Sequence, residues 1–216
     1  AIMGGAVQMD RVLNRIAGNF DNMAYQIEEH IKAVVNLFHY TMINGDATTT
    51  ASGDHPEFQG LDSMLAGTTT EYGTDKAIDL STITAIKSNA DEFYEALSLL
   101  VKTTAADAVL TNTEMITKIQ TVARILGYKT ESEEAFGRRI TTIDGVKLVD
   151  MQDYYTVSGS AATAGHVVKK GLSRTIASAS SATTGLTDIY AVKFDVNDGF
   201  HGISLNGGSV IDQYLP

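Results

Sequence analysis

The sequence contains no cysteine and no tryptophan, and only 2 of its 216 residues are proline. The lack of cysteine excludes disulfide bonds, zinc–thiolate sites, cysteine-ligated iron–sulfur clusters and a cysteine nucleophile. The sequence also lacks any stretch of about 18 consecutive apolar residues, the length that marks a candidate membrane-spanning helix. We therefore expect a fold that is stabilised by its apolar core without covalent cross-links, and no contact with a membrane.

Positive charge is scarce as well, because 16 lysines and arginines face 26 aspartates and glutamates, for a net charge of −10 at pH 7. Nucleic-acid-binding proteins usually neutralise phosphates with a basic face, so we expect no tight direct nucleic-acid site. The 44% hydrophobic residues exclude a disordered chain. The length favours one domain, with or without two lobes, and the odd ends at Ala1 and Pro216 suggest a processed piece of a longer polypeptide.

Two long helices are predicted from hydrophobic periodicity. In residues 21–42 the apolar residues recur at the spacing of one helix face, and the sequence Asn-Gly-Asp at 44–46 predicts the end of this helix. A second helix is expected over residues 88–102, with Ser88 or Asn89 as its N-cap. The apolar stripe of the first helix consists of Met23, Ile27, Ile31, Val34, Val35, Phe38 and Met42.

Shorter elements follow in the second half of the chain. Residues 108–111 predict a buried strand, Asn112 an N-cap, and Gly127 the left-handed residue that closes a third helix. Asp144-Gly145 between apolar residues predicts a two-residue hairpin. Residues 156–187, rich in Ser, Ala, Thr and Gly, are expected to be flexible surface, and 189–194 a strand. Together these elements predict an α+β fold.

No short motif indicates chemistry. Residues 165–171 resemble a phosphate-binding loop only superficially, and we interpret them as a mobile loop with two solvated lysines. Residues 195–199 place the glycine fifth instead of sixth, so a turn explains them better than a calcium loop. The histidines show no metal-binding spacing. We accordingly expect no catalytic site, no cofactor and no metal.

Basic residues gather at only two places in the sequence. In so acidic a chain they are plausible contacts with acidic patches on a neighbouring subunit, although solvated surface is the simpler interpretation. The candidate subunit-interface residues are Arg138, Arg139, Lys169, Lys170 and Arg174.

A series of segments follows a recognisable order: residues 4–10, the long helix with its polar end at 43–46, residues 57–61, residues 108–113 with the helix and Gly127-Tyr128 after them, 143–146 and 188–194. In this order the segments resemble those of the major capsid proteins of tailed bacteriophages, which share the Hong Kong-type capsid fold. The resemblance covers most of the chain, but not the family's N-terminal arm, most of its extended loop, or a last strand after Pro216.

The resemblance implies a wedge-shaped subunit with two lobes. Residues 1–87 with 200–216 would form a peripheral lobe around a long spine helix, and residues 88–199 a mixed αβ axial lobe. The implied function is that of a structural protein of the virion, made in the cytoplasm of a bacterial host, whose hexamers and pentamers form an icosahedral shell around phage DNA. Scaffolding, portal or decoration proteins would be its further partners.

Two alternatives stay open at the level of sequence. The same fold would suit the shell of an encapsulin-type nanocompartment, which encloses an enzyme in place of a genome. A small acid/base enzyme would instead need a spatially assembled pair, for example among Asp144, Asp150, Asp195 and His201.

Overall fold

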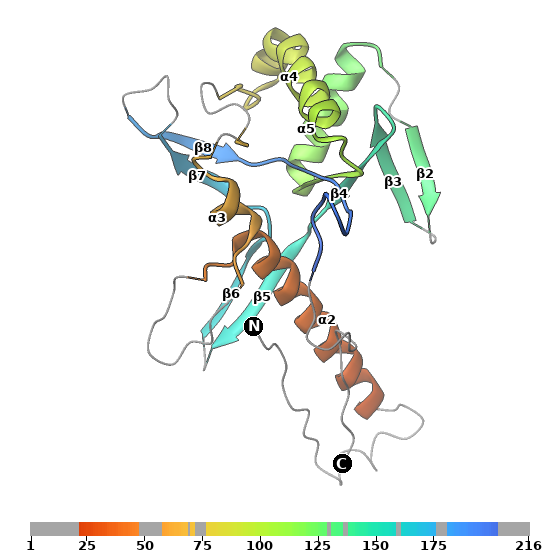
Figure 1. Cartoon of the computed structure of the whole chain (residues 1–216), viewed down its shortest axis with the longest axis vertical. Coiled ribbons are helices and arrows are strands. Elements are labelled where there is room, and N and C mark those ends of the chain that lie inside the picture. Colours follow the sequence, from red (N-terminus) through yellow and green to blue (C-terminus); the bar gives the residue numbers. More distant parts are fainter. Residues whose placement is uncertain are drawn as a thin grey trace.

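The computed structural model describes residues 22–47, 58–68, 70–71, 77–128, 131–135, 138–158, 161–175 and 181–202. These residues combine helices and strands, which confirms the mixed α+β class (Figure 1). The helices are α2 (Asn22–Asn44), α3 (Leu61–Leu65), α4 (Ile83–Thr104) and α5 (Thr113–Ile125). The strands are β1 (Ala108–Thr111), β2 (Glu131–Ala135), β3 (Arg138–Ile143), β4 (Val146–Asp150), β5 (Asp153–Ser158), β6 (Ala161–His166), β7 (Lys170–Arg174), β8 (Thr183–Thr187) and β9 (Tyr190–Val192).

The central sheet has five strands in the order β2-β3-β4-β1-β9. β1 runs parallel to β4, and the other neighbours in the sheet are antiparallel. Two separate hairpins, β5-β6 and β7-β8, complete the described strands. The predicted hairpin turn is confirmed, since Asp144 and Gly145 between β3 and β4 both have positive φ, 49° and 80°.

Strand β1 is buried along its whole length because both faces of the sheet are covered there. Val109 faces the core formed by α4, α5 and β4. Ala108 and Leu110 face a second core, in which the last turn of α2, α3 and Val167-Val168 pack together. The predicted buried strand at 108–111 is therefore confirmed, and it joins the two cores.

Helix α5, which follows β1, begins and ends where the sequence predicts. The Asn112 side chain accepts a hydrogen bond of 3.0 Å from the Met115 backbone N–H, as an N-cap does. Gly127 has φ of 78° directly after the helix, the left-handed conformation expected of a terminating glycine. Both features of this prediction are confirmed.

Helix α4 begins five residues earlier than predicted. Its N-cap is Thr82, whose hydroxyl accepts from the Ala85 N–H at 3.1 Å, so neither Ser88 nor Asn89 caps it. The Asn89 side chain donates instead to the Asp79 carbonyl, at 2.9 Å. Because Ile86 belongs to the buried stripe, the additional turn gains apolar contact with the core.

The expectation of flexible surface over residues 156–187 is wrong for much of that segment. Four strands, β5 to β8, lie wholly or partly in it. Small residues form these strands because each hairpin pairs its own backbone N–H and C=O groups, whatever the side chains are. The expected mobile loop at 165–171 also differs, since Val167 and Val168 are each 1% exposed in the second core.

Candidate functional site

Helix α2 carries an apolar stripe that is only partly buried in the described part of the chain. From Met23 to Tyr40 every residue of the helix is half-buried or exposed, and the first buried residue is Thr41. Ile31 remains 42% exposed and Phe38 41% exposed. The Phe38 ring lies near those of Phe58 and His39, at centroid distances of 5.8 and 6.5 Å. The stripe thus presents exposed apolar surface along most of a 23-residue helix.

The C-terminal end of α2, by contrast, is fixed to the body. Ile43 is 1% exposed in the second core, and the Asn44 side chain donates to the Val167 carbonyl at 2.7 Å. One turn earlier, Tyr40 contacts Tyr154 of β5 at a ring-centroid distance of 4.1 Å. Figure 1 shows the result: α2 extends away from the body, with hairpin β5-β6 beside its anchored end.

A backbone crossing just after α2 strengthens this anchor. The Gly60 N–H donates to the Gly45 carbonyl at 2.8 Å, and the Ser63 hydroxyl donates to the same carbonyl at 3.1 Å. A Cβ on Gly60 would lie 2.5 Å from the Gly45 nitrogen and 2.6 Å from the Ile43 oxygen. The two segments can therefore cross only with glycine at both Gly45 and Gly60. The crossing fastens α3 to the end of α2.

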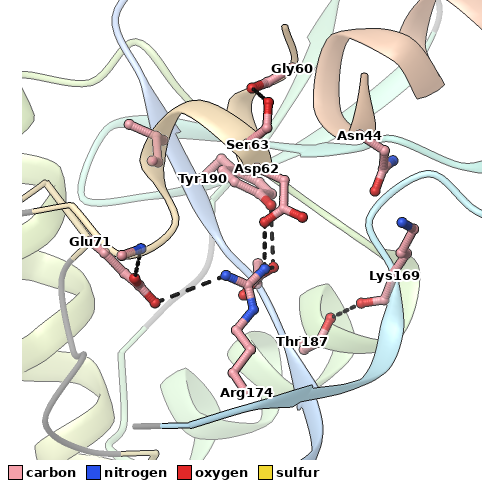
Figure 2. A network of polar contacts seen from close by, with 12 residues as sticks. Asn44, Gly60, Asp62, Ser63, Glu71, Lys169, Arg174, Thr187 and Tyr190 are labelled. Atoms are coloured by element: carbon pink, nitrogen blue, oxygen red, sulfur yellow. Dashed lines mark hydrogen bonds and ion pairs between the residues drawn. The ribbon is translucent and has the colours of Figure 1, made fainter. Parts of the chain in front are cut away.

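A polar cluster around Arg174 holds α3 from its other side (Figure 2). The guanidinium of Arg174, on β7, donates to Asp62 of α3 at 2.5 Å and to Asp188 at 2.7 Å. Glu71 lies 4.0 Å from the same guanidinium, and the Tyr190 hydroxyl donates to Asp188 at 3.2 Å. Three segments far apart in the sequence thus meet at one cation.

The Arg174 cluster contains more negative than positive charge, with three carboxylates around one guanidinium. Burial raises the pKa of Asp188 above its usual value, against the opposing effect of Arg174. Burial, followed by the charge of Asp188, also raises the pKa of Tyr190, so its hydroxyl stays protonated and remains a donor. The cluster is therefore partly buried, and burial and Arg174 act on the pKa of Asp188 in opposite directions.

The cations predicted to contact a neighbouring subunit lie in two different settings. Arg138 and Arg139 are on β3, and their side chains fall outside the described residues. Lys170 pairs with Glu114 at 2.8 Å, and the Lys169 ammonium lies 5.9 Å from the centre of the Tyr40 ring. These lysines and Arg174 have partners within the chain, and a role of the five residues between subunits stays a prediction.

The four residues proposed for an acid/base pair are not all brought into one site. Asp195 and His201 do lie near each other, and backbone hydrogen bonds and, to a smaller extent, the charge of His201 lower the pKa of Asp195. Asp144, at the β3–β4 turn, accepts from the Tyr94 hydroxyl at 2.7 Å. Asp150, at the end of β4, accepts from the Thr113 hydroxyl at 2.6 Å. Asp195 and His201 lie in and after the turn that follows β9, where both are exposed. The side chains thus serve three separate local contacts.

Besides the glycine crossing and the Arg174 cluster, two further side-chain contacts were not predicted from the sequence. His166 and Asp153 form an exposed side-chain pair across the β5–β6 hairpin. Tyr94 stacks on Tyr128 at 4.7 Å, and burial, together with the hydrogen bond to Asp144, raises the pKa of Tyr94 to about 12. For these contacts the sequence offered one signal, the predicted hairpin that places Asp144 at a turn. It could not show that Tyr94 on α4 or His166 on β6 would be the partners, because these residues are distant in sequence from Asp144 and Asp153.

Searches for ligand sites and for relatives give no assignment. Within the described ranges, no group of three or more His, Asp or Glu side chains is arranged to hold a metal ion. None of the helices in the part of the chain that the structure describes has the length and hydrophobicity to cross a bilayer. No protein-family model matches the sequence, and no curated protein matches it either.

Proposed function

We propose that the chain is a structural subunit that assembles with copies of itself into a closed icosahedral shell, the capsid of a tailed phage. The observation that supports the proposal most directly is the apolar stripe of α2. A helix in a folded protein gains most of its stability by packing an amphipathic face, and an isolated helix is marginal in water. Within the stripe, Ile31 and Phe38 are 42% and 41% exposed, so this part of it is available to another surface.

A second copy of the chain is the partner that best suits this stripe. Beside it, Lys32 pairs with both Glu28 and Glu29, each at 2.9 Å, so these three charges are paired within the helix and leave one net negative charge. An apolar stripe with so little free charge beside it favours a partner that is equally apolar and weakly charged. A shell supplies such a partner many times over, since each subunit presents the same surfaces to its neighbours.

The charge of the chain and the order of its segments add support. A net charge of −10 gives the subunit little attraction for DNA phosphates, which suits a container that must release its contents. The segments that resemble the capsid family include the long helix, the β1 strand with the helix after it, and the β3–β4 hairpin. Each of these three lies in the structure as a regular element at the expected position.

The proposal is tested by negative-stain electron microscopy of the full-length gene product and two helix variants. Ile31→Lys places a charge in the stripe, and Ala33→Lys places the same charge on the exposed opposite side. Both new lysines lie three or four residues after a glutamate, which supports the helix equally. We expect uniform closed shells for the unaltered protein and for Ala33→Lys, and only small particles for Ile31→Lys.

The outcomes separate the alternatives clearly. Small monodisperse particles for the unaltered protein would contradict assembly, and shells for Ile31→Lys would show that the stripe is not a contact. Shells purified from the cells that make the protein are then opened. Nuclease-protected DNA supports a capsid, whereas a co-purified enzyme cargo would assign the shell to a nanocompartment.

A further inference from the structure

The turn after β9 is unusually well fixed for an exposed loop. The Phe200 N–H donates to the Lys193 carbonyl at 2.8 Å and closes it. The Asp195 carboxylate accepts from the Asn197 N–H at 2.7 Å and also from the Asp198 N–H, and these two backbone hydrogen bonds lower the pKa of Asp195. A Cβ on Gly199 would lie 2.5 Å from the Asp195 nitrogen. Internal hydrogen bonds and a closely packed glycine thus stabilise the backbone of the turn.

This rigid turn holds apolar side chains in water. Val196 at its tip is 77% exposed, and Phe194 at its base is 53% exposed. The Phe194 backbone N–H donates to Asp107 at 2.8 Å, which fixes the base of the turn to the body. A side chain held in position in this way loses little conformational entropy when it binds, so the turn is prepared for a contact.

An open hollow of about 450 Å³ lies directly beside the turn. Phe200 both lines the hollow and contacts Phe194, with ring centroids 6.5 Å apart. The apolar surface is thus continuous from the hollow to the exposed base of the turn. Other apolar residues that line the hollow are Leu61, Leu65, Tyr190 and Val192.

We propose that the turn at residues 193–200 and this hollow form one self-complementary contact surface, through which two copies of the chain pair about a two-fold axis. In a two-fold contact the same patch meets itself, so a projecting part and a recess that lie side by side can each engage the other copy's counterpart. Val196 of each copy enters the hollow of its partner, beside Leu65 and Phe200.

The charges at the same place fit a second copy. Lys193 and Asp198 both line the hollow and pair with each other at 3.2 Å. The Asp198 side chain is 91% exposed, so its carboxylate is accessible to another cation. When the patch meets its own copy, Lys193 of each chain can face Asp198 of the other, which gives two opposite-charge pairs across the axis. A partner whose surface carries charge of one sign would instead place a like charge against either Lys193 or Asp198.

The inference rests on the proposed function in one respect, that copies of the chain associate, and it names a contact distinct from the α2 stripe. Stable interfaces bury roughly 1,200–2,000 Å² in total. A single turn and hollow provide less, so we expect this pairing to be weak alone and to add to other contacts in the assembly.

Charge reversal tests the contact by sedimentation equilibrium of the full-length protein. Lys193→Glu makes both positions negative, and Asp198→Lys makes both positive, so each variant repels its own copies. We expect each to weaken self-association about tenfold or more. An equal mixture should recover association as mixed pairs, because opposite charges then face each other across the axis. A mixture that associates no better than the single variants would overturn the proposal.

A covalent trap provides a second readout that does not depend on charge. The chain has no cysteine of its own, so Val196→Cys and Leu65→Cys introduce unique thiols. After mixing and mild oxidation we expect a disulfide-linked dimer of one Val196→Cys and one Leu65→Cys chain. As a control, Leu99→Cys replaces Leu65→Cys, since Leu99 is 48% exposed on α4. Equal dimer yields in trap and control would overturn the contact.

The results for the two proposals can be separated. If Ile31→Lys abolishes shells while the charge mixture shows no recovery, the capsid proposal stands and the two-fold contact is wrong. If the mixture and the trap succeed but no shell is observed for the unaltered protein, the contact stands and the capsid proposal is wrong.

Discussion

Helices α2 and α4 are nearly equal in length, at 23 and 22 residues, and both have an apolar stripe, yet only one stripe is buried by the chain itself. In α4 the stripe from Ile86 to Val101 lies in the first core, with Leu97 5% exposed. In α2 only the last turn is buried, and Ile31 is 42% exposed. In the view of Figure 1, α4 lies at the top of the molecule and α2 well below it.

The difference shows two ways of stabilising a helix within one molecule. α4 is stabilised along its length by apolar packing against α5 and the sheet. α2 is held at one end by a glycine crossing, a side-chain hydrogen bond from Asn44 and, through α3, the Arg174 cluster. Ile31 and Phe38 of α2 remain exposed, and a further surface would bury them, which is why we connect α2 to assembly.

The largest expected effect is a truncation inside the α4 stripe. Leu97→Ala removes buried apolar contacts and should lower the free energy of unfolding by about 2–5 kcal/mol. The control Leu99→Ala on the same helix, where the side chain is 48% exposed, should stay within about 0.5 kcal/mol. Urea unfolding of the monomer measures both. Ile31→Ala should likewise change the free energy of unfolding by no more than the control does. If it lowers this free energy as much as Leu97→Ala does, the α2 stripe is buried after all.

A smaller effect is expected at the backbone crossing that anchors α2. Gly60→Ala places a Cβ within 2.5 Å of backbone, so the two segments must separate, at a cost of about 1–3 kcal/mol. Gly202→Ala is the matched control, because a Cβ there meets nothing within 4 Å. Thermal unfolding compares the variants. A Gly60→Ala protein as stable as the Gly202→Ala control would mean that the crossing contributes little to the anchor.

The smallest expected effect is a change in how stability depends on pH at the Arg174 cluster. Burial raises the pKa of folded Asp188, so its charged form destabilises the folded state at neutral pH, and this penalty disappears as the pH falls through the raised pKa. Asp188→Asn should therefore stabilise the protein, relative to the unaltered chain, more at neutral pH than near about pH 4.

The control for this measurement is Asp195→Asn, for which the sign is opposite. Hydrogen bonds from the Asn197 and Asp198 N–H groups lower the pKa of folded Asp195, so its charge stabilises the fold at neutral pH. This variant should be less stable than the unaltered protein at neutral pH, and the difference should decrease in acid. Urea unfolding at both pH values measures the two trends, and parallel trends would contradict the assignment at Asp188.

Local signals predicted the helical elements well. The long helix, the strand at β1, the Asn112 cap, the Gly127 terminus and the Asp144-Gly145 turn all lie where the sequence placed them. Caps and turns are readable because a few neighbouring residues satisfy the backbone or adopt positive φ. The start of α4 was wrong because several Ser and Thr residues precede it, and any of them can cap a helix.

The two hairpins between residues 153 and 187 were missed for a different reason. Their Ser, Ala, Thr and Gly residues show no apolar alternation, and strand pairing is decided by partners many residues away. Gly165 illustrates this, because it lies opposite Tyr154 and a Cβ there would be 3.0 Å from that ring. The Arg174 cluster is similar, since Asp62 is 112 residues distant from its arginine.

The sequence by itself determined the acidic charge, the absence of thiol chemistry and the helices with their caps, because these depend on composition or on residues a few positions apart. Only the tertiary structure decided that Val167 and Val168 are core, that the stripe of α4 is buried while Ile31 and Phe38 of α2 are exposed, and that the turn carrying Val196 borders a hollow. Such facts depend on which distant segments meet, and hydrophobic periodicity reports that a face is apolar without indicating what covers it.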